Sequence, residues 1–352
     1  MTRRVRARGE DIRSFILRNI GKDAITAKAA EHFGITRQAV NLHLQNLVDE
    51  GALLASGNTR SRVYALASAG SVSFMYVLTA DLQEDVVWRK DIQPYLGVLP
   101  SNVVDIWRWA FTEMLNNAID HSAGTHIYVT VSKTALDTEI SVADDGVGIF
   151  TKIQRECGLQ DERQAIFELS KGKLTTDSKK HSGQGIFFTS HMVSGFDILS
   201  GGVYFSHATG SEHDWMLERK AYKSGTTVFL RVENYTSRSV QKTLRSFNVG
   251  DTYDFNKTIV PVSLAKYGLD QLVSRSQAKR VLARVELFSQ VIFDFTGVDM
   301  IGPAFADEIF RVFQLEHPNV TLLPSHTNPE IRGMITAAIK AGRPGFEEEV
   351  LS

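Results

Sequence analysis

A glutamate and an asparagine lie four residues apart in a stretch with the apolar spacing of a helix. Apolar side chains recur every three or four residues from Val103 to Ile119, which predicts a helix with one buried face. Glu113 and Asn117 then lie one turn apart on the same side. The Asn117 amide oxygen can coordinate Mg²⁺, which takes oxygen ligands and commonly shares them with phosphates. The Glu113 carboxylate can orient and deprotonate a water or hydroxyl, although the pair alone also fits an ordinary exposed helix face.

A second motif follows two stretches of alternating apolar residues, a pattern typical of β-strands. The later stretch ends at Asp144, and Gly146 and Gly148 come shortly after it. A carboxylate at a strand end can accept a hydrogen bond from the exocyclic amine of adenine, and glycines let the backbone approach a base closely. Asp and Gly are also the usual residues of plain turns, so this motif alone leaves both interpretations open.

A third motif combines lysines with closely spaced glycines before an apolar helix. The polar segment from Lys171 to Lys180 is rich in lysine. It leads into five residues that begin the helix, Ser182, Gly183, Gln184, Gly185 and Ile186. Backbone amides at a helix start, with ammonium groups nearby, bind phosphate oxygens. We therefore expect these five residues, together with Lys171 and Lys173, to form the phosphate-binding part of a lid.

In this order, the three motifs resemble those of the GHKL superfamily of ATP-binding domains, which includes DNA gyrase, the Hsp90 chaperones, histidine kinases and MutL. The resemblance covers about Ser73 to Val232 and implies the α/β-sandwich Bergerat fold, with ATP and Mg²⁺ as cofactors. The roles that it implies are Mg²⁺ at Asn117, the adenine amine at Asp144, the base and ribose at Gly146 and Gly148, the phosphates at Gly183 and Gly185, and an adenine-side water at Thr226 or Thr227.

The residue at position 113 narrows the activity that this resemblance implies. Histidine kinases usually carry Asn there and need a preceding helical hairpin with a phosphoacceptor histidine, whereas residues 67–100 are short and interrupted by glycine and proline. The string Glu-x-x-x-Asn-Ala-x-x-His is instead similar to ATP hydrolases of the superfamily and to anti-sigma-factor serine kinases, with Glu113 as the base in either. An ATPase switch, a protein serine/threonine kinase and a non-enzymatic ATP sensor all stay open.

The elements before this domain resemble a winged helix-turn-helix. Apolar spacing predicts helices over 10–20 and 27–33, a third helix between Thr36 and Gly51, and two strands within 52–66. Residues 1–66 hold eleven Lys or Arg against six Asp or Glu, although the whole chain has a formal charge of −1. By this resemblance the unit binds double-stranded DNA. The expected contacts are Arg37, Gln38, Asn41 and His43 on the third helix, Arg60 and Arg62 on the wing, and a basic arm over residues 3–8. A protein-interaction or dimerisation role also fits such a unit.

The last third of the chain is expected to form an α/β domain, because predicted helices and strands alternate there. The predicted helices span 274–288, 303–314 and 328–339, and the predicted strands span 290–295 and 320–323.

Residues 294–307 of this part resemble the STAS-like domains, relatives of anti-anti-sigma factors. The phosphorylatable serine of that family falls near Pro303 or Ala304, neither of which carries a hydroxyl. Phosphorylation within the chain is therefore unsupported, with Thr296 and Ser289 as the remaining nearby candidates. Docking of a protein partner is the favoured role.

Length and composition agree with an α/β multidomain chain of three units: a winged helix at 1–68, the ATP-binding domain at 73–235 and the STAS-like domain at 245–345. The chain has 352 residues, 43% of them hydrophobic, enough for several cores. No apolar run is long enough to cross a bilayer or to serve as a signal peptide, so we expect a cytoplasmic protein. A homodimer is a further expectation from the resemblances.

The predicted function is that of an ATP-binding, slowly hydrolysing regulator of transcription. Its nucleotide state would change how the winged helix binds DNA or how the STAS-like domain binds a partner. Ordering of the lid around the phosphates is the expected switch.

Overall fold

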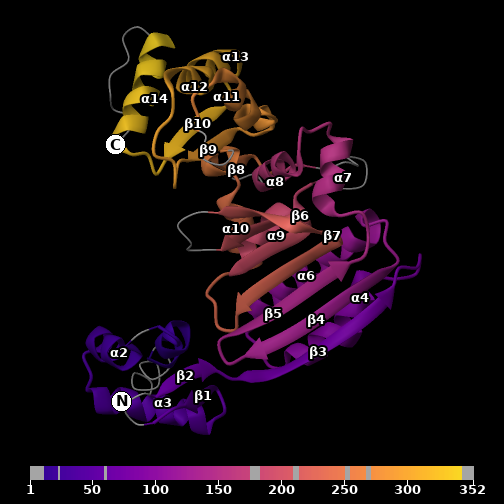
Figure 1. Cartoon of the computed structure of the whole chain (residues 1–352), viewed down its shortest axis with the longest axis vertical. Coiled ribbons are helices and arrows are strands. Elements are labelled where there is room, and N and C mark those ends of the chain that lie inside the picture. The colour runs from indigo at the N-terminus through magenta and orange to yellow at the C-terminus, as the bar shows by residue number, and fades with distance from the viewer. Residues whose placement is uncertain are drawn as a thin grey trace.

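The computed structural model describes residues 12–22, 24–58, 62–174, 183–208, 214–249, 254–266 and 271–342, without the side chains of 219–223. Three units follow one another along the long axis of the molecule, with the N-terminal unit at one end and the C-terminal unit at the other (Figure 1). The predicted DNA contact Arg60, the predicted phosphate contact Ser182 and the basic arm at 3–8 lie outside these ranges.

The N-terminal unit consists of three helices and a two-stranded hairpin. Its elements are the helical residues 12–19, α2 (Ile25–Phe33), α3 (Arg37–Asp49), β1 (Leu53–Ser56) and β2 (Val63–Leu66). The Thr36 hydroxyl accepts a hydrogen bond from the Ala39 amide at 3.2 Å and so caps α3. Buried residues of the helices and the hairpin form a small core of their own. The order of elements therefore follows the sequence prediction.

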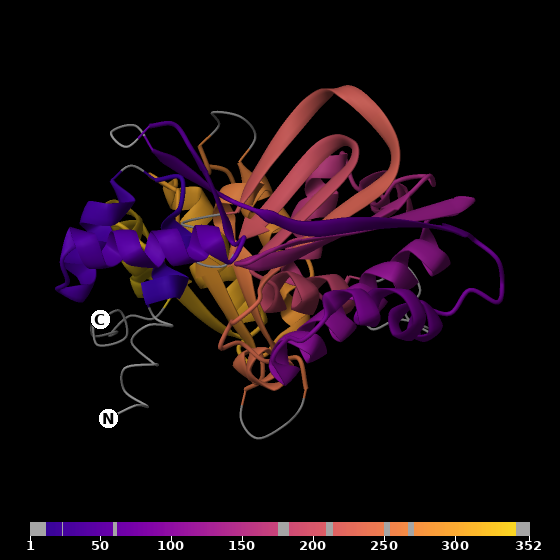
Figure 2. The same cartoon turned by 90° about the horizontal axis from the view of Figure 1, so that it is seen from below.

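The central domain is a five-stranded antiparallel sheet in the order β3-β4-β5-β7-β6, with helices gathered on one of its faces (Figure 2). Its strands are β3 (Ser68–Val77), β4 (His126–Thr134), β5 (Asp137–Asp144), β6 (Gly195–Ala208) and β7 (Trp215–Glu233). Its helices are α4 (Glu84–Val87), the π-helix η1 (Trp88–Ile92), α5 (Gln93–Leu96), α6 (Ser101–His121), α7 (Ile149–Glu156), α8 (Glu162–Lys171), α9 (Gly185–Met192) and α10 (Val240–Ser246).

Helix α6 is the predicted amphipathic helix. Val103, Trp107 and Phe111 on its apolar face are fully buried against the sheet. The same burial pattern leaves Glu113 and Asn117 half-buried on the side of the helix toward α9. The spacing of apolar residues thus fixes where these two polar side chains point.

The N-terminal unit is joined to the central sheet without a linker in the described range 62–174. Ala67 alone separates β2 from β3. The Arg18 guanidinium pairs with the Glu233 carboxylate at 2.8 Å, and Leu136 in the β4–β5 turn packs against the N-terminal core. The gap that the sequence analysis left between residues 68 and 73 is therefore part of strand β3.

The C-terminal domain contains three parallel strands in the order β10-β9-β8 with helices around them. Its elements are β8 (Lys257–Pro261), the 3-10 helix η2 (Val262–Ala265), α11 (Arg275–Leu282), the 3-10 helix η3 (Val285–Leu287), β9 (Gln290–Asp294), α12 (Pro303–Asp307), the π-helix η4 (Glu308–Phe313), α13 (Gln314–Glu316), β10 (Thr321–Ser325) and α14 (Pro329–Gly342).

Two features of this domain differ from the sequence prediction. Strand β8 was not predicted. Helix α11 is shorter than the predicted 274–288, because the backbone leaves helical geometry at Ala283, with ψ of 123°, and Arg284 follows in the left-handed region with φ of 66°. The mixed α/β class and the alternation of helices with strands are confirmed.

The central and C-terminal domains share one continuous hydrophobic core. Phe255, which precedes β8, packs its ring 4.7 Å from Phe187 of α9 and 5.3 Å from Phe288, measured between ring centroids. The two domains are therefore packed against each other through buried aromatic rings. Within the described part of the chain, no helix has both the length and the apolar character needed to span a membrane.

Candidate functional site

A cavity of about 310 Å³ lies beside α6, α9 and the sheet, within the size range of about 300–1,000 Å³ that is common for ligand sites. The predicted site residues that line it are Glu113, Asn117, Asp144, Gly148, Gly183, Gly185, Ile186 and Thr226. The three motifs, which are far apart in the sequence, thus meet in one cavity.

Asp144 is held rigidly at the end of β5. Its Oδ1 accepts hydrogen bonds from the amides of Gly146 at 2.9 Å and Thr226 at 3.2 Å. The Thr226 hydroxyl in turn accepts a hydrogen bond from the Ile149 amide at 2.9 Å. Burial raises the pKa of the Asp144 carboxyl, and the two amide hydrogen bonds partly oppose that shift. All its described hydrogen bonds use Oδ1, so Oδ2 is available to an amine such as that of adenine.

Two glycines allow the backbone to close around Asp144. A Cβ at Gly225, where φ is +79°, would lie 2.0 Å from the Asp144 carbonyl oxygen, and one at Gly146 would lie 2.0 Å from the Ser122 carbonyl oxygen. Both approaches are too close for any side chain. Gly146 therefore packs behind the wall of the cavity. Gly225 is a positioning residue for Asp144, a role that the sequence did not predict, although Gly225 directly precedes Thr226 and Thr227.

Gly225→Ala is expected to weaken adenine-nucleotide binding at least about tenfold, equivalent to about 1.4 kcal/mol. A methyl group must displace the Asp144 carbonyl and also occupies a left-handed backbone position. Titration calorimetry with ADP measures the effect. Gly51→Ala is the matched control, because Gly51 has a φ of +71° but no atom within 4 Å of the added Cβ. Equal ADP affinity in the two variants would show that the close contact has no role.

The opposite end of the cavity brings Glu113 and Asn117 to the start of α9. The Asn117 Nδ2 atom is buried and has no hydrogen-bond partner among the described residues. A Cβ at Gly185 would lie 2.0 Å from the Glu113 Oε2 atom, so the carboxylate lies directly against the first residue of α9. The Asn117 Nδ2 atom and the backbone amides at the helix start can donate hydrogen bonds to phosphate oxygens. The Asn117 amide oxygen is a ligand type that Mg²⁺ accepts, and the Glu113 carboxylate lies beside it.

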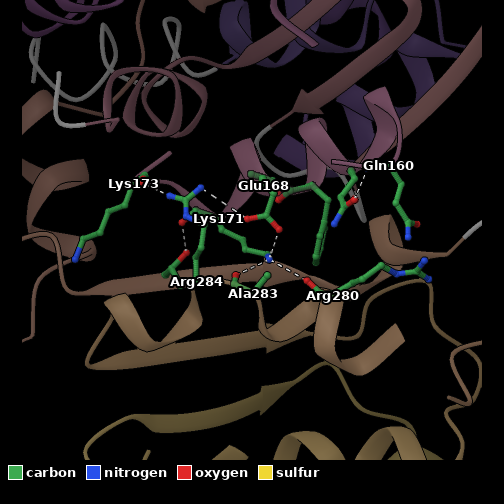
Figure 3. A network of polar contacts seen from close by, with 11 residues as sticks. Gln160, Glu168, Lys171, Lys173, Arg280, Ala283 and Arg284 are labelled. Atoms are coloured by element: carbon green, nitrogen blue, oxygen red, sulfur yellow. Dashed lines mark hydrogen bonds and ion pairs between the residues drawn. The ribbon is translucent and has the colours of Figure 1, made fainter. Parts of the chain in front are cut away.

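Lys171 does not take the predicted place at the phosphates. Its side chain is 1% exposed, and its Nζ binds the Glu168 carboxylate at 2.8 Å and the carbonyls of Arg280 at 3.2 Å and Ala283 at 2.9 Å (Figure 3). These carbonyls lie at the C-terminal end of α11, where the last carbonyls of a helix need a donor. Lys171 therefore caps a helix of the C-terminal domain.

Lys173 also turns away from the described lining of the cavity. Its Nζ donates to the Leu287 carbonyl at 2.8 Å and lies 4.6 Å from the centre of the Phe288 ring. The physical reason is the same for both lysines: the end of α8 is packed against the C-terminal domain, which the sequence pattern did not indicate. Neither lysine lies in the described lining of the cavity, where the sequence predicted them to contact phosphates.

Lys152 supplies positive charge that the sequence analysis overlooked. It lines the cavity from α7, and its Nζ donates to the His121 carbonyl at 3.1 Å. It is the single Lys or Arg among the described lining residues. The sequence feature that could have predicted this role is the position of Lys152, one turn into the helix that follows Gly148. Gln184 and Thr227 are outside the described lining, and Thr227 is buried in the sheet opposite Ala143.

On the N-terminal unit, the predicted DNA contacts are only partly brought together. Arg37, Gln38 and Asn41 are exposed on one side of α3. His43 is half-buried and, at two residues from Asn41, points to another side of the helix. Arg62 is exposed at the start of β2, with its guanidinium carbon 5.9 Å from the centre of the Tyr64 ring. His43 thus does not belong to the exposed polar face.

Two family models match parts of the chain. Residues 103–235 match the "Histidine kinase-, DNA gyrase B-, and HSP90-like ATPase" family, and residues 277–332 match the "STAS-like domain of unknown function (DUF4325)" family. No curated protein matches the chain. The central domain is therefore a GHKL domain, and this family match supports ATP binding by it. The C-terminal domain is STAS-like.

Proposed function

We propose that the protein is an ATP-binding regulator whose nucleotide state is passed both to the STAS-like domain and to an N-terminal winged helix that binds DNA. The observation that carries this proposal is the position of α8. Leu169 on this helix lines the nucleotide cavity, whereas Lys171, two residues later, binds backbone carbonyls of the STAS-like domain. A movement of α8 that accompanies nucleotide binding therefore changes the contacts between the two domains.

A second connection runs through the aromatic rings. Phe187 lines the nucleotide cavity and packs on Phe255, which packs on Phe288 of the STAS-like domain. Close-packed interiors transmit small displacements, because they have little empty space to absorb them. The two connections reach the same part of the STAS-like domain, around α11 and η3.

Strand β7 connects the nucleotide cavity with the N-terminal unit. Thr226 and Val228 of this strand line the cavity, and Glu233 at its end pairs with Arg18. A strand paired on both sides moves as a unit, and β7 is paired with β5 and β6. A movement of β7 at the cavity is therefore expected to move the base of the winged helix as well.

We expect the residues of this site, together with bound Mg²⁺, to support ATP hydrolysis. Asn117 would hold Mg²⁺, which neutralises phosphate charge when it is bound. The Glu113 carboxylate orients and deprotonates the attacking water. Lys152 adds positive charge to the wall, and Asp144 fixes the adenine end. Hydrolysis then returns α8 and β7 to their nucleotide-free positions.

Two alternatives share the same site. The first alternative is a protein serine/threonine kinase that transfers the γ-phosphate to a partner protein. Transfer within the chain is not favoured, because Thr296 and Ser289 are not among the described residues of the nucleotide cavity. Label on a partner protein supports this alternative, and release of free phosphate alone contradicts it. In a non-enzymatic sensor, DNA affinity changes with ADP or a non-hydrolysable ATP analogue while no phosphate is released.

Arg37→Ala is expected to weaken binding to duplexes of any sequence and to reduce the slope of log affinity against log salt by about 1, as for the loss of one phosphate contact. Fluorescence anisotropy with a labelled random duplex at several salt concentrations measures both quantities. Arg89→Ala removes another exposed arginine, from the central domain, and serves as the control. Repeating the titration with ADP and with a non-hydrolysable ATP analogue tests the main proposal, since equal affinities in all three states would overturn it.

A further inference from the structure

A second cavity, of about 250 Å³, lies at the boundary between the central domain and the STAS-like domain. Its described lining comes from α7, α8, α9, β6 and Asp214 just before β7 on one side, and from β8, β9 and the residues that follow them on the other. It shares Leu169 and Ile186 with the nucleotide cavity. The proposed nucleotide function does not use it.

One part of this cavity is apolar and aromatic. The rings of Phe150, Phe196 and Phe205 contribute to its lining, together with aliphatic side chains such as Ile166 and Ile198. Such a surface favours the apolar body of an organic ligand. Aromatic faces also attract cations.

The charged groups of the lining are carboxylates. Asp214 accepts a hydrogen bond from His207 Nδ1 at 2.6 Å through Oδ1. Asp294 also uses Oδ1 alone, for the Thr296 hydroxyl at 2.6 Å and His326 Nδ1 at 2.8 Å. Neither Oδ2 atom has a hydrogen bond within the described part of the chain. Each carboxylate therefore keeps one oxygen that can accept a hydrogen bond from a ligand.

His191 adds a further acceptor. Its Nδ1 lies 2.8 Å from the Phe187 carbonyl, so Nδ1 carries the proton and donates it. Burial is the main cause that lowers the pKa of His191 to about 4, which keeps the imidazole neutral at pH 7 and its Nε2 unprotonated. His207 stacks beside it, with 4.9 Å between ring centroids. Both histidines line this corner of the cavity, and no described lining residue is a lysine or an arginine.

We propose that this cavity is a binding site for a small organic amine, with the protonated nitrogen at the Asp214 and Asp294 carboxylates and the apolar body against the phenylalanine rings. The cavity is smaller than the range of about 300–1,000 Å³ that is common for sites of drug-sized ligands, so it takes a correspondingly small ligand. Two carboxylates without a lysine or arginine in the described lining favour cations over phosphates and other anions, in contrast to the nucleotide cavity with its Lys152.

The shared wall gives this site a role in regulation. An amine that changes the packing of Leu169 or Ile186 also changes the wall of the nucleotide cavity. Binding energies at two linked sites are reciprocal, so the amine and the nucleotide alter each other's affinity by the same factor. The binding of the amine itself does not depend on the proposed nucleotide function, whereas this coupling does.

The test is calorimetric titration of the full chain with 2-phenylethylamine and cyclohexylamine, beside the anion 3-phenylpropionate, which has a similar size and shape. We expect at least one amine to bind and the anion not to bind. Asp294→Asn and Asp214→Asn are each expected to weaken amine binding about tenfold or more, equivalent to a lost charge-assisted contact. Asp299→Asn, an exposed carboxylate of the same domain outside this lining, is the matched control.

The outcomes separate the site from the nucleotide function. ADP affinity is measured for every variant, and a variant that retains it is folded around the nucleotide cavity. The proposal is overturned if neither amine binds, if the anion binds as well as the amines, or if both aspartate variants bind the amines as the unmodified chain does. Amine binding without any change in ADP affinity supports the site and contradicts only its coupling to the nucleotide.

Discussion

Glu113→Gln is expected to reduce the rate of ATP hydrolysis by about 10²–10⁴-fold, the usual effect of removing a general base. Glutamine has nearly the same shape as glutamate but cannot accept the proton of the attacking water. Because Glu113 lies against Gly185 at the start of α9, the isosteric change leaves the wall of the cavity in place. The affinity for ADP should therefore stay within about twofold of that of the unmodified chain, a change of well under 1.4 kcal/mol, which corresponds to tenfold. Phosphate release and calorimetry on the same preparation provide the two measurements.

Two further variants make this experiment selective. Asn117→Ala removes the amide proposed for Mg²⁺, so it should lower both turnover and the dependence of ADP affinity on Mg²⁺. Glu31→Gln changes an exposed glutamate of α2, outside the lining of the cavity, and should leave both quantities unchanged. Turnover that survives in Glu113→Gln would remove this residue from the chemistry. Tight ATP binding without turnover in the unmodified chain would instead select the sensor alternative.

The parts of this site that sequence reasoning predicted are those that depend on local pattern. Apolar periodicity in α6 determines which face is buried and hence where Glu113 and Asn117 point. Asp144 was recognisable because it ends an alternating strand immediately before glycines. Both patterns are short-range, and tertiary packing in this chain follows them.

The parts that were missed depend on contacts between distant segments. Lys171 belongs to a lysine-rich run that is typical of a solvated loop, but its partners are carbonyls more than a hundred residues later in the chain. Strand β8 is a short segment that contains Pro261, and its identity as a strand comes from pairing with β9. The close approach of Gly225 to Asp144 likewise joins two strands. Residue type and local spacing contain no information on such pairings.

The charged cluster of Glu168, Lys171 and Arg284 offers the strongest test of how the two domains are joined. Burial lowers the pKa of Lys171, and the Glu168 carboxylate partly opposes that shift. The Arg284 guanidinium lies 3.8 Å from the Glu168 Oε2 atom and also donates to the Lys173 carbonyl. The last turn of α8 and the end of α11 are thus held together by Lys171 and Glu168, which have almost no access to water, with the partly exposed Arg284 beside them.

Lys171→Met is expected to lower the free energy of unfolding by about 3–5 kcal/mol, because it removes the closer partner of the buried Glu168 carboxylate and leaves only the Arg284 guanidinium at 3.8 Å. It also leaves the carbonyls of Arg280 and Ala283 without their donor. Urea unfolding monitored by circular dichroism measures the change. Lys279→Met is the matched control: Lys279 is 70% exposed and lies 3.7 Å from Glu308, so its loss should cost about 1 kcal/mol or less.

The double variant Lys171→Met with Glu168→Leu separates charge from packing. Replacing both members of a buried pair by apolar residues is often neutral or stabilising, so this variant should recover much of the stability lost in Lys171→Met. It does not recover the hydrogen bonds between α8 and the STAS-like domain. If those bonds transmit the nucleotide state, the double variant is stable, binds ADP, and no longer changes its DNA affinity in response. A stable double variant that retains the full response would assign the transmission to the rings of Phe187, Phe255 and Phe288 instead.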